Sequence, residues 1–397
     1  MDRSMIEREA AVRQIPAGDT AAVRSFARLE RHLNAERSHY VAPTEADVVK
    51  LLTGRSSLHA DIEHALFVVS DGNGREVACC AAMINRRYQQ FHKEAVGFIG
   101  YFAAADDAGR RAIDLLAAAE RWLAERGVTR VVAGYNGHLL AGFTLRTAEF
   151  ESGPIFPYQW HPPLYIELFE TAGYRPTYPW WSYRIDFSSD PYRAASARAL
   201  RDARCQIRPV NKKRWDADIE IAMRLYNETF QDEWEYHPFT IEEVREFFKP
   251  LKPIFDPRLL LLAEVDGEPA GFCFGLPDWS PHARALKGKS NPFAQLRFAL
   301  GARKYQDGGL YAIGVLERHR GKHIGQTLAS SLYRRYEEVG LKGAEYHSVN
   351  EANLASRTLA TSLGGEGRIL YHNFDKVLPA TLGHHGSAAL GGAAHER

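Results

Sequence analysis

A short basic segment that contains two glycines is the part of the chain best suited to chemistry. The segment Arg318-His-Arg-Gly-Lys-His-Ile-Gly325 follows an apolar run and precedes residues with helical spacing. Backbone N–H groups at a helix N-terminus, the helix dipole and nearby cations together bind anions. Glycine lets a phosphate come close to the backbone because it has no Cβ. The pattern predicts a phosphate site here, although a solvated basic corner would have the same composition.

Two strand–helix units must position this segment. We expect a buried strand over 310–316, a helix beginning at Ile324, a strand over 344–349, a helix ending at Leu363 and a last strand over 368–374. Asn353 followed three residues later by Ser356 is typical of a helix cap, and Gly364-Gly365 is typical of a helix stop.

This order of elements resembles the GNAT superfamily of acyl-CoA-dependent N-acyltransferases. The family pattern is a strand ending in Val, then Arg/Gln-x-x-Gly-x-Gly/Ala, a helix, a strand and Asn-x-x-Ala/Ser. Arg320-x-x-His323-x-Gly325 matches it except that His323 replaces the first glycine. Asn353 and Ser356 match the second part.

Two further positions depart from the family. Leu363-Gly364-Gly365 replaces the usual Leu-Gly-Phe close. The tyrosine that many members use to protonate the departing thiolate aligns with Ala360. The resemblance therefore implies donor binding more strongly than it implies a particular proton donor.

The resemblance implies that acetyl-CoA or another acyl-CoA is the acyl donor. Its diphosphate would bind the loop from Arg320 to Gly325, and its pantetheine arm would pair between two parallel strands that splay apart. A main-chain N–H near Ile313–Val315 would then face the acyl oxygen. The residues expected to bind the donor are Ile313, Gly314, Val315, Arg318, Arg320, Gly321, Lys322, His323, Ile324, Gly325, Gln326, Asn353 and Ser356. We expect no metal, because His319 and His323 lack a third ligand.

The catalytic candidates are the titratable residues expected near the splayed strands. His347 lies on the second of these strands, and four titratable residues follow the first helix of the C-terminal half: Asp232, Glu233, Glu235 and His237. Of these four we favour Glu233 and His237. Tyr371 on the last strand could protonate the thiolate. A lone histidine in an apolar strand is also a common core residue, and a charged loop is commonly solvated. A water relay to a distant carboxylate would serve equally well.

The amino-acid composition is that of a globular protein with sizeable hydrophobic cores. The 397 residues are 45% hydrophobic and 25% charged, which suits two or three domains. A formal net charge of +1 gives no general basic excess for nucleic acid. The four cysteines show no C-x-x-C spacing and are predicted to be reduced. We find neither a secretory signal nor an apolar segment long enough for a bilayer, so we expect a cytoplasmic protein.

The order of elements occurs twice along the chain. We predict an α/β (α+β) fold of tandem GNAT-like domains, each a mixed, mostly antiparallel twisted sheet with a splayed parallel strand pair, flanked by helices. In the second copy, Thr240-Ile-Glu-Glu243 is a capping box that begins a helix. The predicted bounds are a flexible N-terminus 1–10, a first domain 11–187, a linker 188–204, a catalytic domain 205–377 with an insertion 277–309, and a flexible tail 378–397.

The first copy lacks the basic loop. Its corresponding segment, Ala103-Ala-Ala-Asp-Asp-Ala-Gly109, places Asp106 and Asp107 before a helix. Carboxylates cap a helix N-terminus well but repel a diphosphate. We therefore predict a degenerate copy that has lost donor binding and walls off the substrate cleft.

Taken together, these patterns predict an N-acyltransferase that moves an acyl group, acetyl as the first expectation, to the amine of a small molecule by direct attack on the thioester. One alternative is a transferase whose donor is an aminoacyl-tRNA or a carrier protein, which would contact basic residues of the insertion. Another is a non-catalytic ligand-binding protein of the same fold, which His323 and Ala360 favour. The insertion is either a substrate lid or a segment that packs on the first half. We expect no membrane partner, and nucleic acid only as a tRNA donor.

Overall fold

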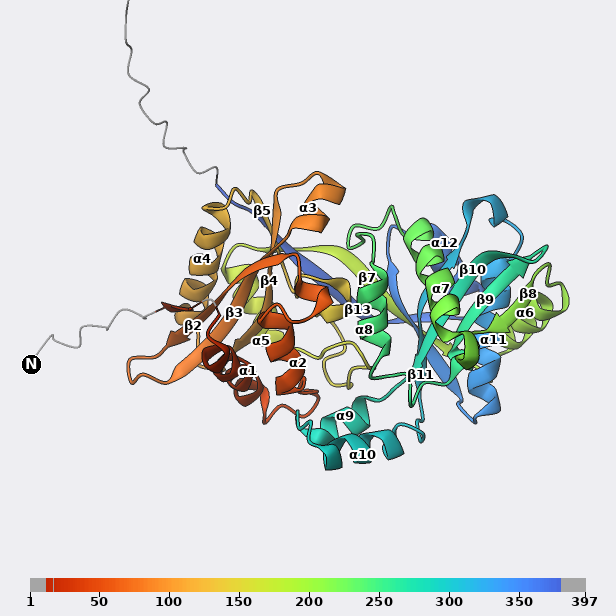
Figure 1. Cartoon of the computed structure of the whole chain (residues 1–397), viewed down its shortest axis with the longest axis horizontal. Coiled ribbons are helices and arrows are strands. Elements are labelled where there is room, and N and C mark those ends of the chain that lie inside the picture. The colour runs from red at the N-terminus through yellow and green to blue at the C-terminus, as the bar shows by residue number, and fades with distance from the viewer. Residues whose placement is uncertain (1–11, 17, 380–397) are drawn as a thin grey trace, which may run out of the picture.

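The computed structural model describes residues 12–16 and 18–379, which form two halves that lie side by side (Figure 1). The predicted N-terminal segment and nearly all of the predicted tail lie outside the described residues. The elements of the first half are β1 (Val12–Ile15), α1 (Thr20–Asn34), α2 (Glu45–Leu52), β2 (Ile62–Ser70), β3 (Glu76–Asn85), α3 (Arg86–His92), β4 (Val96–Ala104), α4 (Arg110–Ala124), β5 (Arg130–Ala133), β6 (Leu145–Arg146), α5 (Pro163–Thr171) and β7 (Arg175–Asp186).

The second half repeats this order, as predicted. Its elements are α6 (Asp190–Arg201), β8 (Gln206–Pro209), α7 (Trp215–Thr229), α8 (Ile241–Phe248), β9 (Leu260–Val265), β10 (Glu268–Pro277), α9 (Ser280–Leu286), α10 (Pro292–Gly301), β11 (Gly308–Val315), α11 (Ile324–Glu338), β12 (Gly343–Asn350), α12 (Leu354–Ser362) and β13 (Glu366–Val377). The predicted capping box is present, since Thr240 and Glu243 bond reciprocally at the start of α8.

One sheet runs through both halves. Within the described residues thirteen strands join, in the order β1-β2-β3-β4-β5-β13-β7-β12-β11-β10-β9-β8, with β6 on β13. Only the β4–β5 and β11–β12 pairs are parallel among these, so the mostly antiparallel sheet with parallel pairs is confirmed. The two sheets expected from the sequence are joined into one.

The last strand of each half crosses to the other half. β7 pairs with β12, and Ile185 and Phe187, at and just beyond its end, belong to the core of the second half. β13 pairs with β5, and Phe374 and Leu378 belong to the core of the first half. β7 and β13 also pair with each other at the centre of the molecule (Figure 1).

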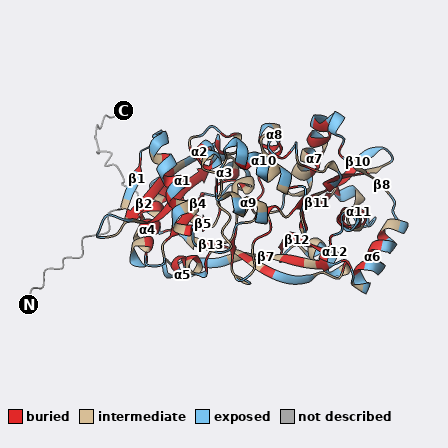
Figure 2. Cartoon of the chain, turned by 90° about the horizontal axis from the view of Figure 1, so that it is seen from below, coloured by how far each residue is buried: buried red, intermediate tan, exposed pale blue. Residues whose placement is uncertain are grey.

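Helices cover both faces of the sheet in the second half. A Cβ on Gly275 of β10 would lie 2.8 Å from Leu332 of α11, so α11 packs closely on one face. A Cβ on Gly314 of β11 would lie 2.2 Å from Thr229 Oγ1 of α7, so α7 packs closely on the opposite face. Figure 2 shows buried residues along the strands and exposed residues on the outer faces of the helices.

The predicted polar linker contains a packed helix. Ser189 caps α6, and Pro191 occupies the first turn, where its fixed φ favours a helix. The alanine-rich sequence that follows has a high helix propensity. Tyr192, Ala195 and Ala199 are buried, and α6 packs on α11.

The two aspartates that precede α4 do not cap it, contrary to the prediction. Gly109 is the N-cap residue, and no side chain caps this helix. Asp106 pairs with Arg37 at 2.7 Å, and Asp107 pairs with Arg75. The two carboxylates therefore pair with guanidinium groups of neighbouring segments and do not accept hydrogen bonds from the first N–H groups of α4.

The insertion packs against the first half rather than lying free as a lid. Asp278 Oδ1 accepts a hydrogen bond from the Phe156 backbone N–H at 3.0 Å. A Cβ on Gly288 would lie 2.9 Å from the Pro43 carbonyl oxygen. α9 and α10 accordingly lie beside the first half, near its junction with the second (Figure 1). Among the described residues, no helix combines the length and apolar character that crossing a membrane requires.

Candidate active site

The parallel strands β11 and β12 separate soon after they meet. Their only paired positions are Gly309↔Glu345 and Leu310↔Tyr346, although both strands continue for several residues. Tyr311 is skipped in the register between β10 and β11, which makes a bulge at the point of separation. On the other strand Ser348 has a positive φ of 52°, a backbone conformation common at functional sites. The structure thus has an opening between these strands, with its apex near Leu310.

The basic corner beyond β11 is open. Apart from the adjoining backbone and chain neighbours, no heavy atom of a described residue lies within 4 Å of a Cβ built on Gly321, and the nearest to one on Gly325 are 3.9 Å away. Arg320 and Lys322 are exposed, and Arg318 Nη1 lies 3.5 Å from Glu228 Oε1. No side chain caps the first N–H groups of α11. These donors and cations are available to an anion.

His323 occupies the N-cap position of α11 in a left-handed conformation, with φ 59°. This conformation favours glycine, which explains physically why the family pattern has glycine here. The ring does not cap the helix, because its Nδ1 lies 2.8 Å from Gln326 Oε1. Ile324, the next residue, is buried in the core and anchors the corner.

The predicted donor-binding and catalytic residues meet at the start of α12. Asn353 Oδ1 accepts from the Ser356 N–H at 3.0 Å, and Asn353 Nδ2 donates to Glu233 Oε1 at 2.7 Å. Burial raises the pKa of Glu233, while the bond from Asn353 opposes that rise. Ile313 and Val315 lie on β11 beyond its last pairing with β12.

His347 lies behind the opening rather than in it. Its Nδ1 is 3.0 Å from Ser182 Oγ, and Ser182 donates to Glu345 at 2.9 Å. The imidazole is 1% exposed between the rings of Tyr158 and Tyr311, with centroids at 4.9 and 4.8 Å. Burial lowers the pKa of His347 to about 3. This environment is that of a neutral core histidine.

Tyr371 is also buried near this point. It lies on β13, and its ring centroid is 5.6 Å from that of Tyr158. Its hydroxyl has no hydrogen-bond partner, and burial raises its pKa. Because burial raises its pKa, this phenol is a weaker acid than an ordinary tyrosine and a poorer proton donor to a thiolate.

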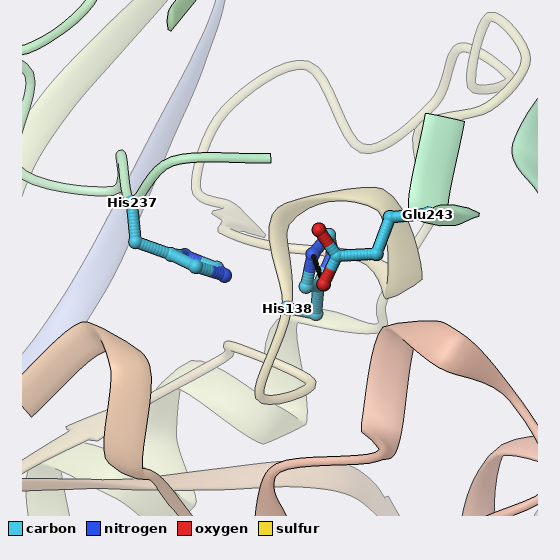
Figure 3. A group of neighbouring side chains, drawn as sticks. All are labelled: His138, His237 and Glu243. Carbon is cyan, nitrogen blue, oxygen red and sulfur yellow. Dashed lines mark ion pairs between the residues drawn. The ribbon is translucent and has the colours of Figure 1, made fainter. Parts of the chain in front are cut away.

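His237 belongs to a separate buried group between the two halves (Figure 3). A ring nitrogen of His138, a ring nitrogen of His237 and a carboxylate oxygen of Glu243 all lie within 4.8 Å of one another, as the atoms of a metal site would. His138 Nδ1 accepts a hydrogen bond from the Leu140 N–H, and its Nε2 lies 3.5 Å from Glu243 Oε1.

Glu243 is already fully engaged in this group. Arg87 donates to its Oε1, and the Thr240 N–H donates to its Oε2. These occupied atoms favour a structural ion-pair group that joins the halves. Burial lowers the pKa of His237 to about 2, so the ring is neutral.

An apolar cavity of about 260 Å³ opens at the apex of the separated strands. It lies between α7 and α8 on one side and β9, β10 and β11 on the other, and reaches the first half through the segments 139–143 and 157–159. Its walls are Leu139, Leu140, Ala141, Gly142, Phe143, Pro157, Tyr158, Gln159, Ile219, Ala222, Met223, Tyr226, Phe230, Glu235, Phe239, Val244, Phe247, Phe248, Leu260, Phe272, Phe274, Leu276, Tyr311, Ala312 and Ser348. Ala312 and Ser348, from the two separated strands, bring the cavity to the opening.

Glu235 is the one carboxylate in this wall. The side chain is buried, and its Oε2 has no hydrogen-bond partner among the described residues. Burial, with a smaller repulsion from Glu233, raises the pKa of Glu235 well above the ordinary carboxyl value. A carboxylate with a raised pKa is suited to accept a proton near neutral pH. Glu235 is one of the four loop residues that the sequence places near the site, but Glu233 and His237 are the two predicted to be catalytic. The signal was its place between Trp234 and Tyr236, where aromatic neighbours indicate burial.

Comparisons with known proteins agree with this geometry. Residues 219–364 match the model of the acetyltransferase (GNAT) family. The chain is 28% identical over 377 residues to the bacterial ceramide synthase of Caulobacter vibrioides (strain NA1000 / CB15N), an alignment that covers 92% of this chain and 97% of that protein.

Solved structures show the same architecture. A tandem GNAT protein from the clavulanic acid biosynthesis pathway aligns with a TM-score of 0.53 and 16% identity, over 92% of this chain and 98% of that one. A GCN5-related N-acetyltransferase from Sphaerobacter thermophilus aligns with a TM-score of 0.50 and 17% identity, over 93% and 95%. These similarities show the tandem fold.

Proposed function

We propose that this chain, a tandem protein of GNAT fold, is an N-acyltransferase that uses an acyl-CoA in its second half. The observation that carries the proposal is the opening between β11 and β12, which joins an exposed cationic corner at one end to a buried cavity at the other. A thioester donor has the matching form, with an anionic diphosphate at one end and an acyl group at the other.

The donor would be held mainly by backbone groups. Its diphosphate would accept hydrogen bonds from N–H groups between Gly321 and Gly325, with Arg320 and Lys322 as charge partners. Its pantetheine amides would pair with the free edge of β11 beyond Leu310. This places the thioester next to Ala312 and Ser348, where the cavity begins.

The reaction then needs a proton acceptor at that point. The nitrogen of a neutral amine attacks the thioester carbonyl carbon, a C–N bond forms, and the C–S bond breaks. Glu235 accepts the proton that the amine loses, and the departing thiolate takes up one proton. The products are an amide and the CoA thiol, so the overall proton count is unchanged. Glu235 is better placed than Glu233, whose carboxylate is bonded to Asn353.

The class of acceptor is suggested by the relative from Caulobacter vibrioides. That protein is named a bacterial ceramide synthase, and a ceramide is a fatty-acyl amide of a long-chain amino alcohol. The alignment spans nearly the whole of both chains, including the segments that form the cavity. We therefore propose an amino alcohol with a long alkyl chain as the acceptor.

A direct assay tests the proposal. Purified protein is incubated with an acyl-CoA and a long-chain amino alcohol, and both the free thiol and the amide are measured. We expect equal amounts of both products, with hydrolysis of the thioester as the control without amine. Release of thiol that does not depend on the amine, or no turnover with any acyl-CoA, would contradict an N-acyltransferase.

A further inference from the structure

We infer that the apolar cavity is the binding site for one long, unbranched alkyl chain of a substrate. The inference rests on the proposed function and names the substrate class that its site accepts. The walls are mainly aliphatic and aromatic side chains, and Glu235 is the one carboxylate among them. An apolar chain gains free energy in such a site in proportion to the area that it removes from water.

The size of the cavity sets the length of the chain. An apolar cavity of ~150 Å³ holds the six carbons of benzene, so about 260 Å³ accommodates roughly ten carbons. An acetyl group would leave most of this volume empty. A long chain, carried either by the acyl donor or by the acceptor, would fill the cavity, and in the second case the donor can still be acetyl-CoA.

The position of the cavity determines where the polar end of the chain lies. One end of the cavity is formed by Tyr311, Ala312 and Ser348 at the opening between the strands. The opposite wall is formed by side chains of α8 and β9, including Phe248 and Leu260, which are buried. A chain with its polar end at the opening would thus extend into the layer between the helices α7 and α8 and the sheet.

Calorimetry with two ligand series tests this inference. CoA and acyl-CoAs of increasing length form one series, and alkylamines of increasing length form the other, each without the second substrate. We expect the affinity in one series to rise by about fourfold per methylene, up to roughly ten carbons. The series that shows the rise identifies the substrate that carries the chain.

Ala222→Phe supplies the structural control, because Ala222 lines the cavity on α7. The larger ring should abolish the increase with chain length while CoA itself still binds, which shows that the protein is folded. The matched variant is Ala217→Phe, since Ala217 is exposed on the same helix and should behave as the wild type.

The possible failures are distinct. If CoA binds but neither series depends on chain length in the wild type, the cavity inference is wrong and the proposed function stands. A length dependence that Ala222→Phe leaves unchanged also overturns it. If CoA does not bind at all, the proposed donor is wrong. The alkylamine series then still tests whether the cavity binds an alkyl chain.

A different part of the surface carries a second inference. α10, in the insertion, exposes three large apolar side chains with spacing i, i+3 and i+7: Phe293 at 77%, Leu296 at 58% and Leu300 at 58%. Large exposed apolar side chains that are grouped in this way mark an interaction surface. α10 lies at the outer edge of the molecule (Figure 1).

Cations surround these side chains. Lys287 and Lys289 precede α10, Arg297 lies within it, and Arg303 and Lys304 follow it. All five are exposed, and none forms an ion pair with a described residue. Apolar side chains flanked by unpaired cations are the arrangement of helices that bind an anionic bilayer surface.

We propose that α10 docks on the surface of an anionic lipid bilayer, lying parallel to it. The apolar residues would enter the boundary of the acyl chains, and the cations would contact the lipid phosphates. This proposal differs from the expectation that the protein has no membrane partner.

Sedimentation with vesicles tests the docking. The probes are vesicles of phosphatidylcholine alone and of phosphatidylcholine with phosphatidylglycerol. We expect the wild type to bind the anionic vesicles, less so at high salt, and a variant with Phe293→Ser, Leu296→Ser and Leu300→Ser to lose that binding. The control is Val377→Ser, which removes an apolar side chain that is 77% exposed on β13.

Two results would overturn the docking. One is equal sedimentation of the wild type and the triple variant with anionic vesicles. The other is self-association of the wild type that the triple variant lacks, without vesicle binding, which would make α10 a contact between copies of the chain.

Discussion

At the scale of single residues, the account depends most on Glu235. Its carboxyl is buried in an apolar wall, and its pKa is raised by that burial. We expect Glu235→Gln to lower kcat by about 10²- to 10⁴-fold with little change in KM, because an amide cannot accept the proton of the amine. Glu233→Gln, two residues away, should have a much smaller effect, because Asn353 already binds that carboxylate. The reverse order of effects would assign the base to Glu233.

The pH dependence of both activity and stability follows from the same residue. Because the pKa of Glu235 is raised in the folded protein, kcat should increase with pH over a pH range above the ordinary carboxyl pKa. In Glu235→Gln this increase of kcat with pH should be absent. The folded state binds this proton more tightly than the unfolded state, so ionisation removes stability as the pH rises. Glu235→Gln should therefore have a higher Tm than the wild type at neutral pH and a similar one near pH 4. A lower Tm at neutral pH would mean that the carboxylate is stabilised by contacts of its own.

Gly325 tests the phosphate site. A Cβ there has no neighbour closer than 3.9 Å, so Gly325→Val should fold normally. We expect CoA to bind about 10- to 100-fold more weakly, the loss of charged hydrogen bonds of roughly 1.5–3 kcal/mol. Calorimetry measures this, and His323→Gly is the companion variant, because glycine suits φ 59° and should retain or improve affinity. Unchanged affinity in Gly325→Val would place the diphosphate elsewhere.

The sequence reveals the residue types at the corner, because Arg320, Gly321 and Gly325 lie within six consecutive residues at a helix start. It does not reveal which of several titratable loop residues faces the cavity. Glu233, Glu235 and His237 alternate along five residues, and only their contacts distinguish them: Asn353 binds Glu233, while His237 lies beside His138. Those contacts come from parts of the chain that are distant in sequence.

At the scale of elements, α8 joins the halves through its N-terminus. Glu243 completes the capping box and also binds Arg87 from α3, across the boundary between the halves. Hydrogen bonds and ion pairing lower the pKa of Glu243 to about 2, despite its burial. The capping box can be predicted from the sequence Thr240-x-x-Glu243. The ion pair between Glu243 and Arg87 cannot, because Arg87 is distant in sequence.

Stability should therefore depend on Glu243 in acid. Its stabilising effect is present above the ordinary carboxyl pKa and is lost as the pH falls from about 4.5 to about 2. We expect Glu243→Gln to lower the free energy of unfolding at pH 7 by on the order of 3 kcal/mol, and to lose this acid dependence. Denaturant unfolding at several pH values measures both. Glu242→Gln, an exposed neighbour in the same turn, is the matched control, and an equal effect of both variants would contradict the account.

At the scale of the whole molecule, the exchanged strands make the two halves interdependent. Removal of β13 would leave the edge of β5 unpaired and take Phe374 from the core of the first half. We expect a chain that ends at Gly365 to lose amide protection in β4 and β5, as measured by hydrogen exchange, although both strands lie far from the truncation in sequence. A chain that ends at Pro379 retains every described strand and should be protected like the full protein. Equal protection in both truncated chains would show that the first half folds without β13.

The exchange could not be predicted from the sequence. The repeat, the hairpins and the strand–helix units are local patterns of apolar residues and turn residues, so their order is visible in one chain. The partners of residues 175–186 and 366–377 are not, because neither segment carries a local pattern that specifies the strand with which it pairs. The resulting sheet is also what brings Tyr158, Tyr371 and His347 together from different segments.

The central claim is that the second half holds an acyl-CoA with its diphosphate at the start of α11 and its thioester between β11 and β12. A crystal structure with CoA bound is its most direct test. We predict phosphate oxygens on the N–H groups between Gly321 and Gly325, and the sulfur between Ala312 and Ser348, facing the cavity that Glu235 lines. CoA bound at any other surface, with the opening between the strands filled by side chains, would contradict the claim.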